Sequence, residues 1–284
     1  SGMDAGLYTF TLNIPPNFQA DLLAGRQPTI QLNVDATQVS QAFTGAGQIQ
    51  QIIASETADF VRRYRSVDAL PVEAVVRTAF NPNLNRAWFG AVNEVINQIT
   101  MLAIILTGAA LIREREHGTI EHLLVMPVTP FEIMVGKVWA MGLVVLAAAA
   151  FALRFVVEGW LDIPIQGSLL LFASGAALHL FAATSMGIFF GTVARSMPQL
   201  GLLVILTLIP LQILSGGVTP RESMPALIQH IMLAAPTTHF VELAQAILFR
   251  GAGVSVIWPQ LLALLAIGAV FFLGALSRLR QSLR

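Results

Sequence analysis

The sequence predicts a polytopic, mainly α-helical membrane protein that also carries a small α/β domain near its N-terminal end. Of the 284 residues, 55% are hydrophobic and only 11% are charged, whereas a soluble domain usually carries about 25% charged residues. Residues 1–88 have the mixed composition of a water-soluble domain. From Gly90 onward, apolar runs alternate with short polar breaks, and each run reaches the roughly 20 residues that a helix needs to cross a bilayer.

Five apolar runs predict five membrane-spanning helices, at about residues 88–112, 136–157, 168–194, 199–217 and 256–276. The third run contains small residues that allow close helix packing in lipid, namely Ser174, Gly175, Ser185 and Gly187. We therefore divide the chain into an α/β domain at 1–88 and a membrane domain at 89–284.

Arginine and lysine predict the orientation, because they are enriched in cytoplasmic loops. One side of the predicted bundle receives Arg113, Arg115, Lys137, Arg195, Arg278, Arg280 and Arg284, and the other receives Arg154, Arg221 and Arg250. We expect the first side, with the C-terminus, to be cytoplasmic and residues 1–88 to lie outside. Since a domain placed outside needs a preceding segment to start its translocation, we also expect a further membrane helix ahead of residue 1.

The N-terminal domain shows the pattern β-α-β-α-β, which is typical of a small and here incomplete α/β unit. Alternating polarity predicts strands at about 7–14, 29–34 and 72–80. Helices are predicted at 17–24, with Gly25 just beyond its end, and at 37–65, where Gly45 and Gly47 interrupt the pattern.

The loop at 113–137 is the most informative part of the sequence. Four charged residues open it, and Ile120, Leu123 and Leu124 then share one face of a helix that Pro127 ends. Thr129 and Glu132 around Pro130 predict the capped start of the next helix. Such an amphipathic segment can lie at a membrane interface with or without a partner, and the residues alone leave both possibilities open.

A second unusual stretch, residues 215–255, is too polar and too broken for an ordinary span. Thr219 and Glu222 repeat the capping pattern and predict a helix to about Ala234, followed by another from Thr237 to Phe249. Within the spans, Arg154 and Glu158 are spaced for an ion pair. His179 is the one ionisable residue deep in a span, which makes it a candidate for the transport pathway or for a hydrogen-bonded packing role, and Gln212 is a similar candidate.

Three groups of residues together resemble the type-2 ABC transporter permeases, in particular the multidrug-efflux-like members with a large outer domain. The first group is Arg113-Glu114-Arg115-Glu116, Gly118-Thr119-Ile120-Glu121, Leu123-Leu124, Pro127 and Gly136-Lys137. The second is Leu214-Ser215-Gly216-Gly217, Pro220, Glu222-Ser223-Met224-Pro225, Pro236 and His239-Phe240-Val241-Glu242-Leu243. The third, in the N-terminal domain, is Ile14-Pro15-Pro16-Asn17-Phe18 with Leu22-Leu23-Ala24-Gly25.

The resemblance implies a six-helix fold whose first helix is absent here. It implies that two permeases pair in the bacterial cytoplasmic membrane, and that each binds a separate ABC ATPase through the cytoplasmic loop to export a hydrophobic or amphipathic substrate. The residues that would couple to the ATPase are Arg113, Glu114, Arg115, Glu116, Gly118, Thr119, Glu121 and Pro127. Residues 215–255 would form a re-entrant outer gate with Gly216, Gly217, Pro220, Glu222, Pro236 and Glu242.

The cofactors ATP and Mg²⁺ are expected on the partner subunit, because the sequence contains no Gly-x-x-x-x-Gly-Lys-Ser/Thr loop to hold phosphates. A second permease, homodimeric or heterodimeric, and lipid are expected partners. A periplasmic adaptor and an outer-membrane channel are further candidates that the sequence leaves open. The formal net charge of zero gives no indication of nucleic-acid binding.

Three other functions were weighed. A zinc protease would need two histidines four residues apart, whereas His117 and His122 are five apart and diverge by about 140° on a helix, so we expect no metal site. An ion-driven transporter usually shows internal repeats and charged midplane sites, and the sequence shows no repeat. A non-transporting membrane scaffold remains the third alternative, although the loop carboxylates of a coupled permease are present.

Overall fold

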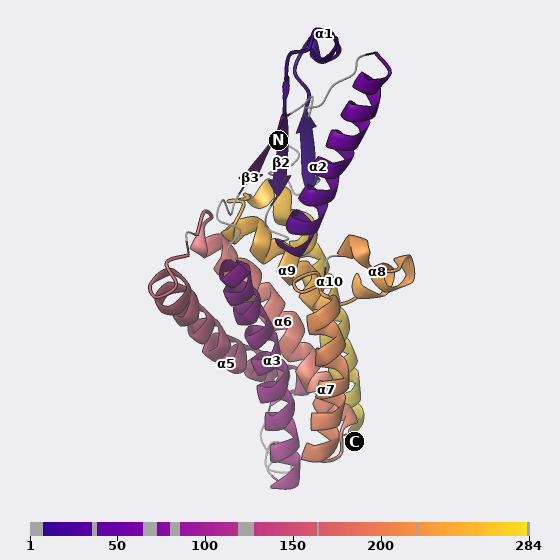
Figure 1. The fold of residues 1–284 in the computed structure, drawn as a ribbon. Coiled ribbons are helices and arrows are strands. Elements are labelled where there is room, and N and C mark those ends of the chain that lie inside the picture. Colours follow the sequence, from indigo (N-terminus) through magenta and orange to yellow (C-terminus); the bar gives the residue numbers. More distant parts are fainter. Residues whose placement is uncertain are drawn as a thin grey trace. The chain divides into compact units, whose positions relative to one another are not determined.

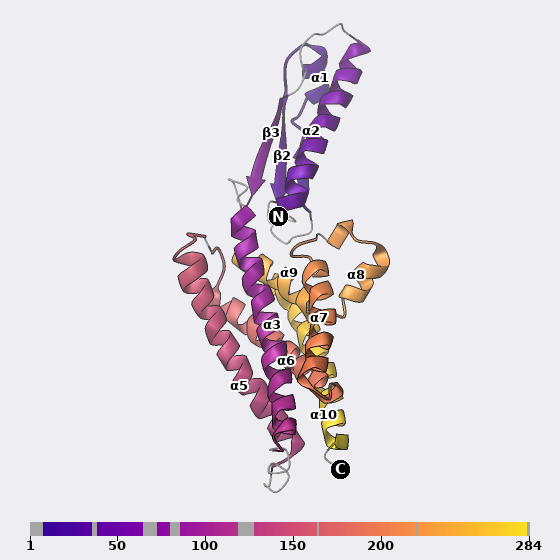
Figure 2. The same cartoon turned by 60° about the horizontal axis from the view of Figure 1, so that its bottom comes forward.

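The computed structural model describes residues 8–35, 39–64, 73–79, 86–118, 128–163, 165–219 and 221–282. The chain forms two compact units, Ser1–Phe89 and Gly90–Arg284, which are described separately (Figures 1 and 2).

The first unit is a three-stranded sheet covered on one face by a long helix. Its elements are β1 (Phe10–Asn13), α1 (Phe18–Leu23), β2 (Thr29–Asp35), α2 (Val39–Arg62) and β3 (Glu73–Ala79). The central strand β2 pairs antiparallel with β1 and parallel with β3. Alternate residues of β2 are buried, namely Ile30, Leu32 and Val34, and they pack toward α2 around Ile49 and Ile53. The predicted β-α-β-α-β order is confirmed.

The prediction that Gly45 and Gly47 interrupt the second helix was wrong, since α2 runs unbroken through both. Gly45 has a packing role instead, because a Cβ at this position would overlap the ring of Phe10 on β1. The glycine therefore lets the helix approach the sheet, which offsets the roughly 1 kcal/mol that glycine costs inside a helix.

In the described part of the second unit, five helices are long and apolar enough to cross a membrane, which confirms the predicted number of spans. They are α3 (Arg86–Glu116), α5 (Pro130–Phe151), α6 (Leu169–Val193), α7 (Met197–Leu214) and α10 (Val254–Ser282). The end of α5 continues as a π-helical segment, η1 (Ala152–Glu158), which was not predicted. Arg154 and Glu158 in this segment form the predicted ion pair, at 2.9 Å.

Successive helices run in opposite directions, so the bundle has two ends (Figure 1). We call the end where α3 finishes and α5 begins the loop end. The opposite end carries a short 3₁₀ turn, η2 (Arg221–Ser223), and two helices, α8 (Ala226–Met232) and α9 (Pro236–Leu248), that meet at 87°. We call it the hairpin end.

The helix predicted to start behind Thr219 begins later than expected. Only the single turn η2 forms there, and α8 starts at Ala226. Pro225 explains the break, because proline disfavours the helical conformation in the residue before it and removes a backbone donor.

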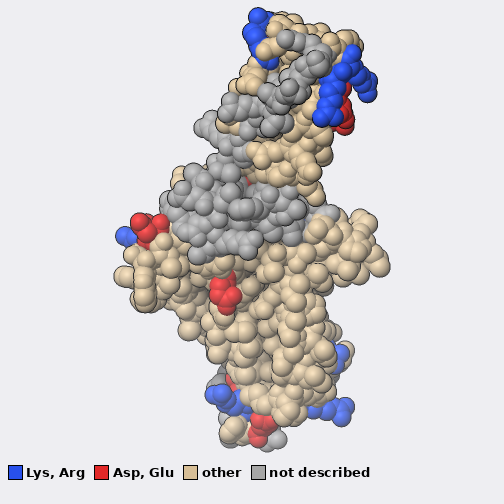
Figure 3. Space-filling view, in the orientation of Figure 1, with Lys and Arg blue, Asp and Glu red and all other residues tan. Residues whose placement is uncertain are grey.

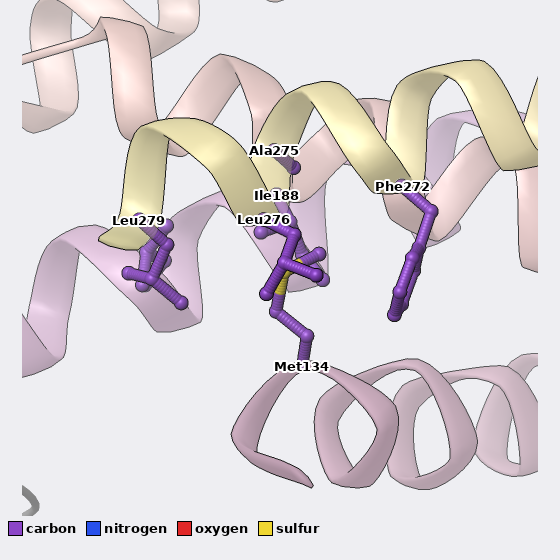
Figure 4. Close-up of a cluster of buried hydrophobic side chains, with 7 residues drawn as sticks. Met134, Ile188, Phe272, Ala275, Leu276 and Leu279 are labelled. Carbon is purple, nitrogen blue, oxygen red and sulfur yellow. The ribbon is translucent and has the colours of Figure 1, made fainter. Parts of the chain in front are cut away.

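Helix α6 is the centre of the bundle. In an apolar 18-residue stretch of each span, buried residues make up 56% in α6 and 50% in α3, against 22% in α5 and in α10 and 17% in α7. At the loop end, Met134, Ile188 and Phe272 bring α5, α6 and α10 into one apolar cluster, which Leu111 of α3 completes (Figure 4). Helices α5, α7 and α10 therefore expose most of their apolar surface, whereas at least half of α3 and of α6 is buried.

Small residues let α3 and α6 come close together. A Cβ on Gly187 would overlap the Thr107 hydroxyl and lie 2.6 Å from the carbonyl oxygen of Ile104. A Cβ on Gly191 would lie 3.0 Å from the carbonyl oxygen of Gly108. Gly187 and Gly191 are four residues apart and so form the small-xxx-small face that brings membrane helices into backbone contact.

Candidate functional site

The four charged residues in the last turn of α3 form two pairs that differ in their exposure. Glu114 and Arg115 are partly buried and turn toward other helices, whereas Arg113 and Glu116 are exposed. All four were predicted to couple to a partner, but the structure gives them different surroundings. Only the exposed pair presents its charge to solvent in this chain.

Glu114 forms an ion pair with Lys137, the single lysine of the sequence. The side chains are 30% and 13% exposed, so the pair is shielded from bulk water more than a typical surface pair. It joins the end of α3 to the second turn of α5. The pair therefore closes the base of the loop between these two helices.

Arg115 makes a second link at the loop end. Its Nη1 donates to the carbonyl oxygen of Ala194, at 3.0 Å. Ala194 is the residue that caps the C-terminal end of α6, where unpaired carbonyl groups carry partial negative charge. The guanidinium therefore ties α3 to the end of the central helix.

Both ends of the loop are capped. At the α3 end, Gly118 adopts φ +68°, a conformation that glycine reaches without strain, and its N–H donates to the Arg115 carbonyl at 3.3 Å. At the α5 end, the Glu132 N–H donates to Thr129 Oγ1, and the Glu132 carboxylate accepts the Thr129 N–H at 2.7 Å. This capping box confirms the prediction made from Thr129-Pro130-Phe131-Glu132. The predicted coupling residues Thr119, Glu121 and Pro127 lie outside the described residues.

At the hairpin end, α7 finishes in a glycine turn. Gly216 has φ +96°, and a Cβ on Gly217 would overlap the side-chain amide of Asn93 on α3. Arg221 in η2 lies 3.5 Å from the carboxylate of Glu242 on α9, a contact that is partly exposed. The turn, η2 and α9 are therefore connected on the side of the bundle where α3 begins.

The other predicted gate residues belong to the same region. Pro236 is buried in the first turn of α9, Glu222 is the middle residue of η2, and Pro220 lies outside the described residues. Their role in a gate stays a prediction.

His179 is fully buried between three helices. Its Nε2 lies 2.8 Å from Thr100 Oγ1 on α3, and its ring stacks on Phe240 of α9 with centroids 4.1 Å apart and planes 6° apart. The Thr100 hydroxyl also lies 3.0 Å from the Ile96 carbonyl. The Thr100 hydroxyl therefore joins the imidazole Nε2 of His179 to the backbone of α3.

The sequence had offered His179 as a pathway residue or as a packing residue, and the described contacts are those of packing. Gln212 is half-buried near the end of α7, and its main-chain carbonyl oxygen accepts a hydrogen bond from the Ser215 hydroxyl at 3.2 Å. Among the described contacts, none links Gln212 to His179, Thr100 or Phe240.

One feature of α3 was not predicted, although its spacing is visible in the sequence. Asn93, Thr100, Thr107 and Glu114 follow each other at intervals of seven residues along α3. Seven residues make almost two full turns, so all four lie on one face of the helix. We call this set the polar row of α3.

Comparison with known proteins identifies the family of this chain. A family model described as "ABC-2 family transporter protein" matches residues 1–277. The chain belongs to the ABC-2 transporter family. This confirms the family predicted from the three groups of residues, and it makes the chain an integral membrane protein, the permease of an ABC transporter.

Named relatives of this ABC-2 permease are themselves permeases. It is 65% identical over 283 residues to the inner membrane transport permease YhhJ of Escherichia coli K12, covering all of this chain and 76% of the relative. It is 28% identical over 271 residues to the probable multidrug ABC transporter permease YbhR of the same organism, covering 95% of this chain and 73% of the relative. ABC transporter G family member 20 of Dictyostelium discoideum is 22% identical over 221 residues, which are 77% of this chain and 30% of that protein.

Proposed function

We propose that this permease exports a hydrophobic or amphipathic substrate across the bacterial inner membrane, and that a separate ABC ATPase drives it from the loop end. The observation that carries the proposal is that two charged residues at the end of α3 are exposed while the two between them contact other helices. The exposed residues Arg113 and Glu116 offer opposite charges to a partner. The inward residues Glu114 and Arg115 contact α5 and α6, so a force applied at the loop reaches three membrane helices.

The distribution of basic residues supports a cytoplasmic loop end. Described arginines and lysine at this end are Arg113, Arg115, Lys137, Arg195, Arg278 and Arg280, against Arg86, Arg154, Arg221 and Arg250 at the hairpin end. On the face shown in Figure 3, charged side chains gather at the loop end below a broad uncharged surface. By the positive-inside rule, we place the loop end in the cytoplasm and the hairpin end, with α8 and α9 as an outer gate, on the far side.

The substrate class is supported by an apolar groove and by the relatives. The groove has a volume of about 560 Å³ and lies between α5, α6 and α10, where Trp139, Leu143 and Phe181 contribute to its walls. Nearly all of its lining is apolar, which suits an apolar or amphipathic molecule taken from the membrane. YbhR is named a probable multidrug permease, and we propose a substrate of comparable character here.

Copurification with the ATPase tests the proposal. The full-length permease is co-expressed with ABC ATPases of the same organism, and the ATPase retained on the tagged permease is measured for the wild type, Glu116→Arg and Glu94→Arg. Glu94 is an exposed carboxylate on the same helix at the hairpin end, so it is the matched control. We expect the Glu116 variant to lose the ATPase and the Glu94 variant to keep it. Equal retention in both variants, or no retention by the wild type, would contradict the proposal.

A further inference from the structure

The polar row of α3 extends across the whole membrane. Glu114 lies 21 residues after Asn93, a rise of about 32 Å along a helix, close to the roughly 30 Å of a bilayer core. Thr100 and Thr107 are fully buried, Asn93 is nearly so, and Glu114 is partly buried. Polar side chains at such depth face the protein interior, where they engage other polar groups or the backbone.

The four members of the row contact three segments of the bundle: the turn after α7, helix α6 and helix α5. Asn93 lies against Gly217 behind α7, Thr100 is hydrogen-bonded to His179 of α6, and Thr107 lies against Gly187 of α6. Glu114 pairs with Lys137 of α5. One face of one helix therefore touches the loop end, the central helix and the hairpin end.

Helix α3 is also well suited to move as one piece. Helices α7 and α10 contain Pro210 and Pro259 within their length, and α5 changes to a π-helix at Ala152. Proline and π-helical turns are the usual places where helices bend. The 31 residues of α3 contain neither, so a displacement at Glu114 is carried to Thr100 with little loss.

His179 extends this connection to the hairpin. Its imidazole is held by Thr100 on one side and stacks on Phe240 of α9 on the other. Two residues beyond Phe240, Glu242 of the same helix pairs with Arg221 of η2. These contacts connect α3 to α9 through the buried ring of His179. They also connect α9 to η2, the 3₁₀ turn that precedes α8.

We infer that α3 is the rigid link that transmits movement of the loop end to the α8–α9 hairpin, and that His179 is the positioning residue through which α3 engages α9. This inference rests on the proposed function, because it assumes that an ATPase moves the loop end. In it, the Glu114–Lys137 pair transfers movement into the membrane helices. The Thr100–His179–Phe240 junction transfers it to the outer gate.

Thiol labelling can follow both ends separately, since the sequence contains no native cysteine. One reporter is Val128→Cys beside the loop, and the other is Leu227→Cys on α8, where the side chain is 72% exposed. The full-length permease with its ATPase is reconstituted in nanodiscs, and the rate of maleimide labelling is measured without nucleotide and with ATP and vanadate. In the wild type we expect the nucleotide to change the rate at both reporters.

Thr100→Val removes the hydroxyl that is hydrogen-bonded to His179 while keeping the shape of the side chain. We expect the nucleotide-dependent change at the Leu227 reporter to fall about three-fold, the size expected for one hydrogen bond between membrane helices, with the change at the Val128 reporter retained. Thr184→Val is the matched control. Thr184 is equally buried on α6 and, among the described contacts, its hydroxyl donates only to carbonyls of its own helix. We expect this control and Thr100→Ser to behave like the wild type.

The outcomes distinguish the link through His179 from the proposed coupling to an ATPase. If Thr100→Val keeps the full response at the Leu227 reporter, the link through His179 is wrong and the proposed function stands. If the wild type shows no nucleotide response at the Val128 reporter, the proposed coupling to an ATPase fails, and the inference fails with it. If Thr100→Val does not accumulate in the membrane, Phe240→Leu, which removes the stacking on His179, is measured in its place. A full response at the Leu227 reporter in Phe240→Leu would then contradict the link through His179, and a reduced response would support it.

Discussion

Replacing Gly187 by alanine tests the close approach of α3 and α6. A Cβ at this position would overlap the Thr107 hydroxyl and would lie 2.6 Å from the Ile104 carbonyl oxygen and 2.9 Å from the Ile104 Cα. Real Cβ atoms do not come this close, and two of the three neighbours are backbone atoms that cannot rotate away. The two helices would therefore have to separate at their crossing point.

The expected magnitude follows from two opposing effects. Overpacking of a well-packed site costs about 1–3 kcal/mol, and replacing a helical glycine by alanine gains up to about 1 kcal/mol. We therefore expect a net loss of about 1–2 kcal/mol in the free energy of unfolding. For a chain of this size, that corresponds to a fall of roughly 2–8 °C in Tm.

The assay is the midpoint of heat-induced loss of the monodisperse peak in size-exclusion chromatography of the detergent-solubilised permease. Gly142→Ala is the control, because Gly142 also lies within a membrane helix and a Cβ there would meet nothing within 4 Å. The control should keep or slightly raise the midpoint. If Gly187→Ala raised the midpoint as the control does, the backbone contact between α3 and α6 would be refuted.

Four further changes test the ion pair and the two caps at the loop end. Glu114→Gln removes the pair with Lys137 but leaves the exposed charges of α3 intact, so we expect the ATPase to be retained in copurification while substrate-stimulated ATP hydrolysis falls. The exchange of Glu114→Lys with Lys137→Glu should restore part of that stimulation, and failure to restore any would argue against the pair as the coupling contact. Thr129→Ala removes the hydroxyl of the capping box and should lower the unfolding midpoint in line with a loss of about 1 kcal/mol, whereas Thr129→Ser should not. Gly118→Ala forces a side chain into a positive-φ position at a cost of about 1 kcal/mol, and limited proteolysis of the loop should show faster cleavage; an unchanged cleavage rate would speak against the helix end at Gly118.

The spans were predictable because membrane crossing depends on a property of local sequence, a run of apolar residues of fixed length. The capping box at Thr129 and the ion pair of Arg154 with Glu158 were predictable for the same reason, since their partners are three or four residues apart. The break at Pro225 could also have been read locally, and the expectation of a helix starting behind Thr219 gave the capping pattern more weight than the proline that follows.

Long-range contacts could not be predicted in this way. Gly45 looked like a helix breaker, and only its neighbour Phe10, 35 positions away in the chain, gives it a packing role. Glu114 and Glu116 looked equivalent in the charged run, because nothing local shows that Lys137 returns to the side of α3 that carries Glu114. The polar row was visible as a spacing, but its meaning depends on His179 and Gly187, which come from a different helix.

The most direct test of the central claim is transport itself. Inside-out membrane vesicles that contain the full-length permease, with or without its ABC ATPase, are mixed with a fluorescent amphipathic dye, and uptake is followed after addition of ATP or after imposition of a proton gradient. We predict uptake only when both subunits and ATP are present, and none when the ATPase is replaced by a variant that cannot hydrolyse ATP. Uptake that follows the proton gradient in vesicles without the ATPase would contradict the account and would identify the chain as an ion-driven transporter.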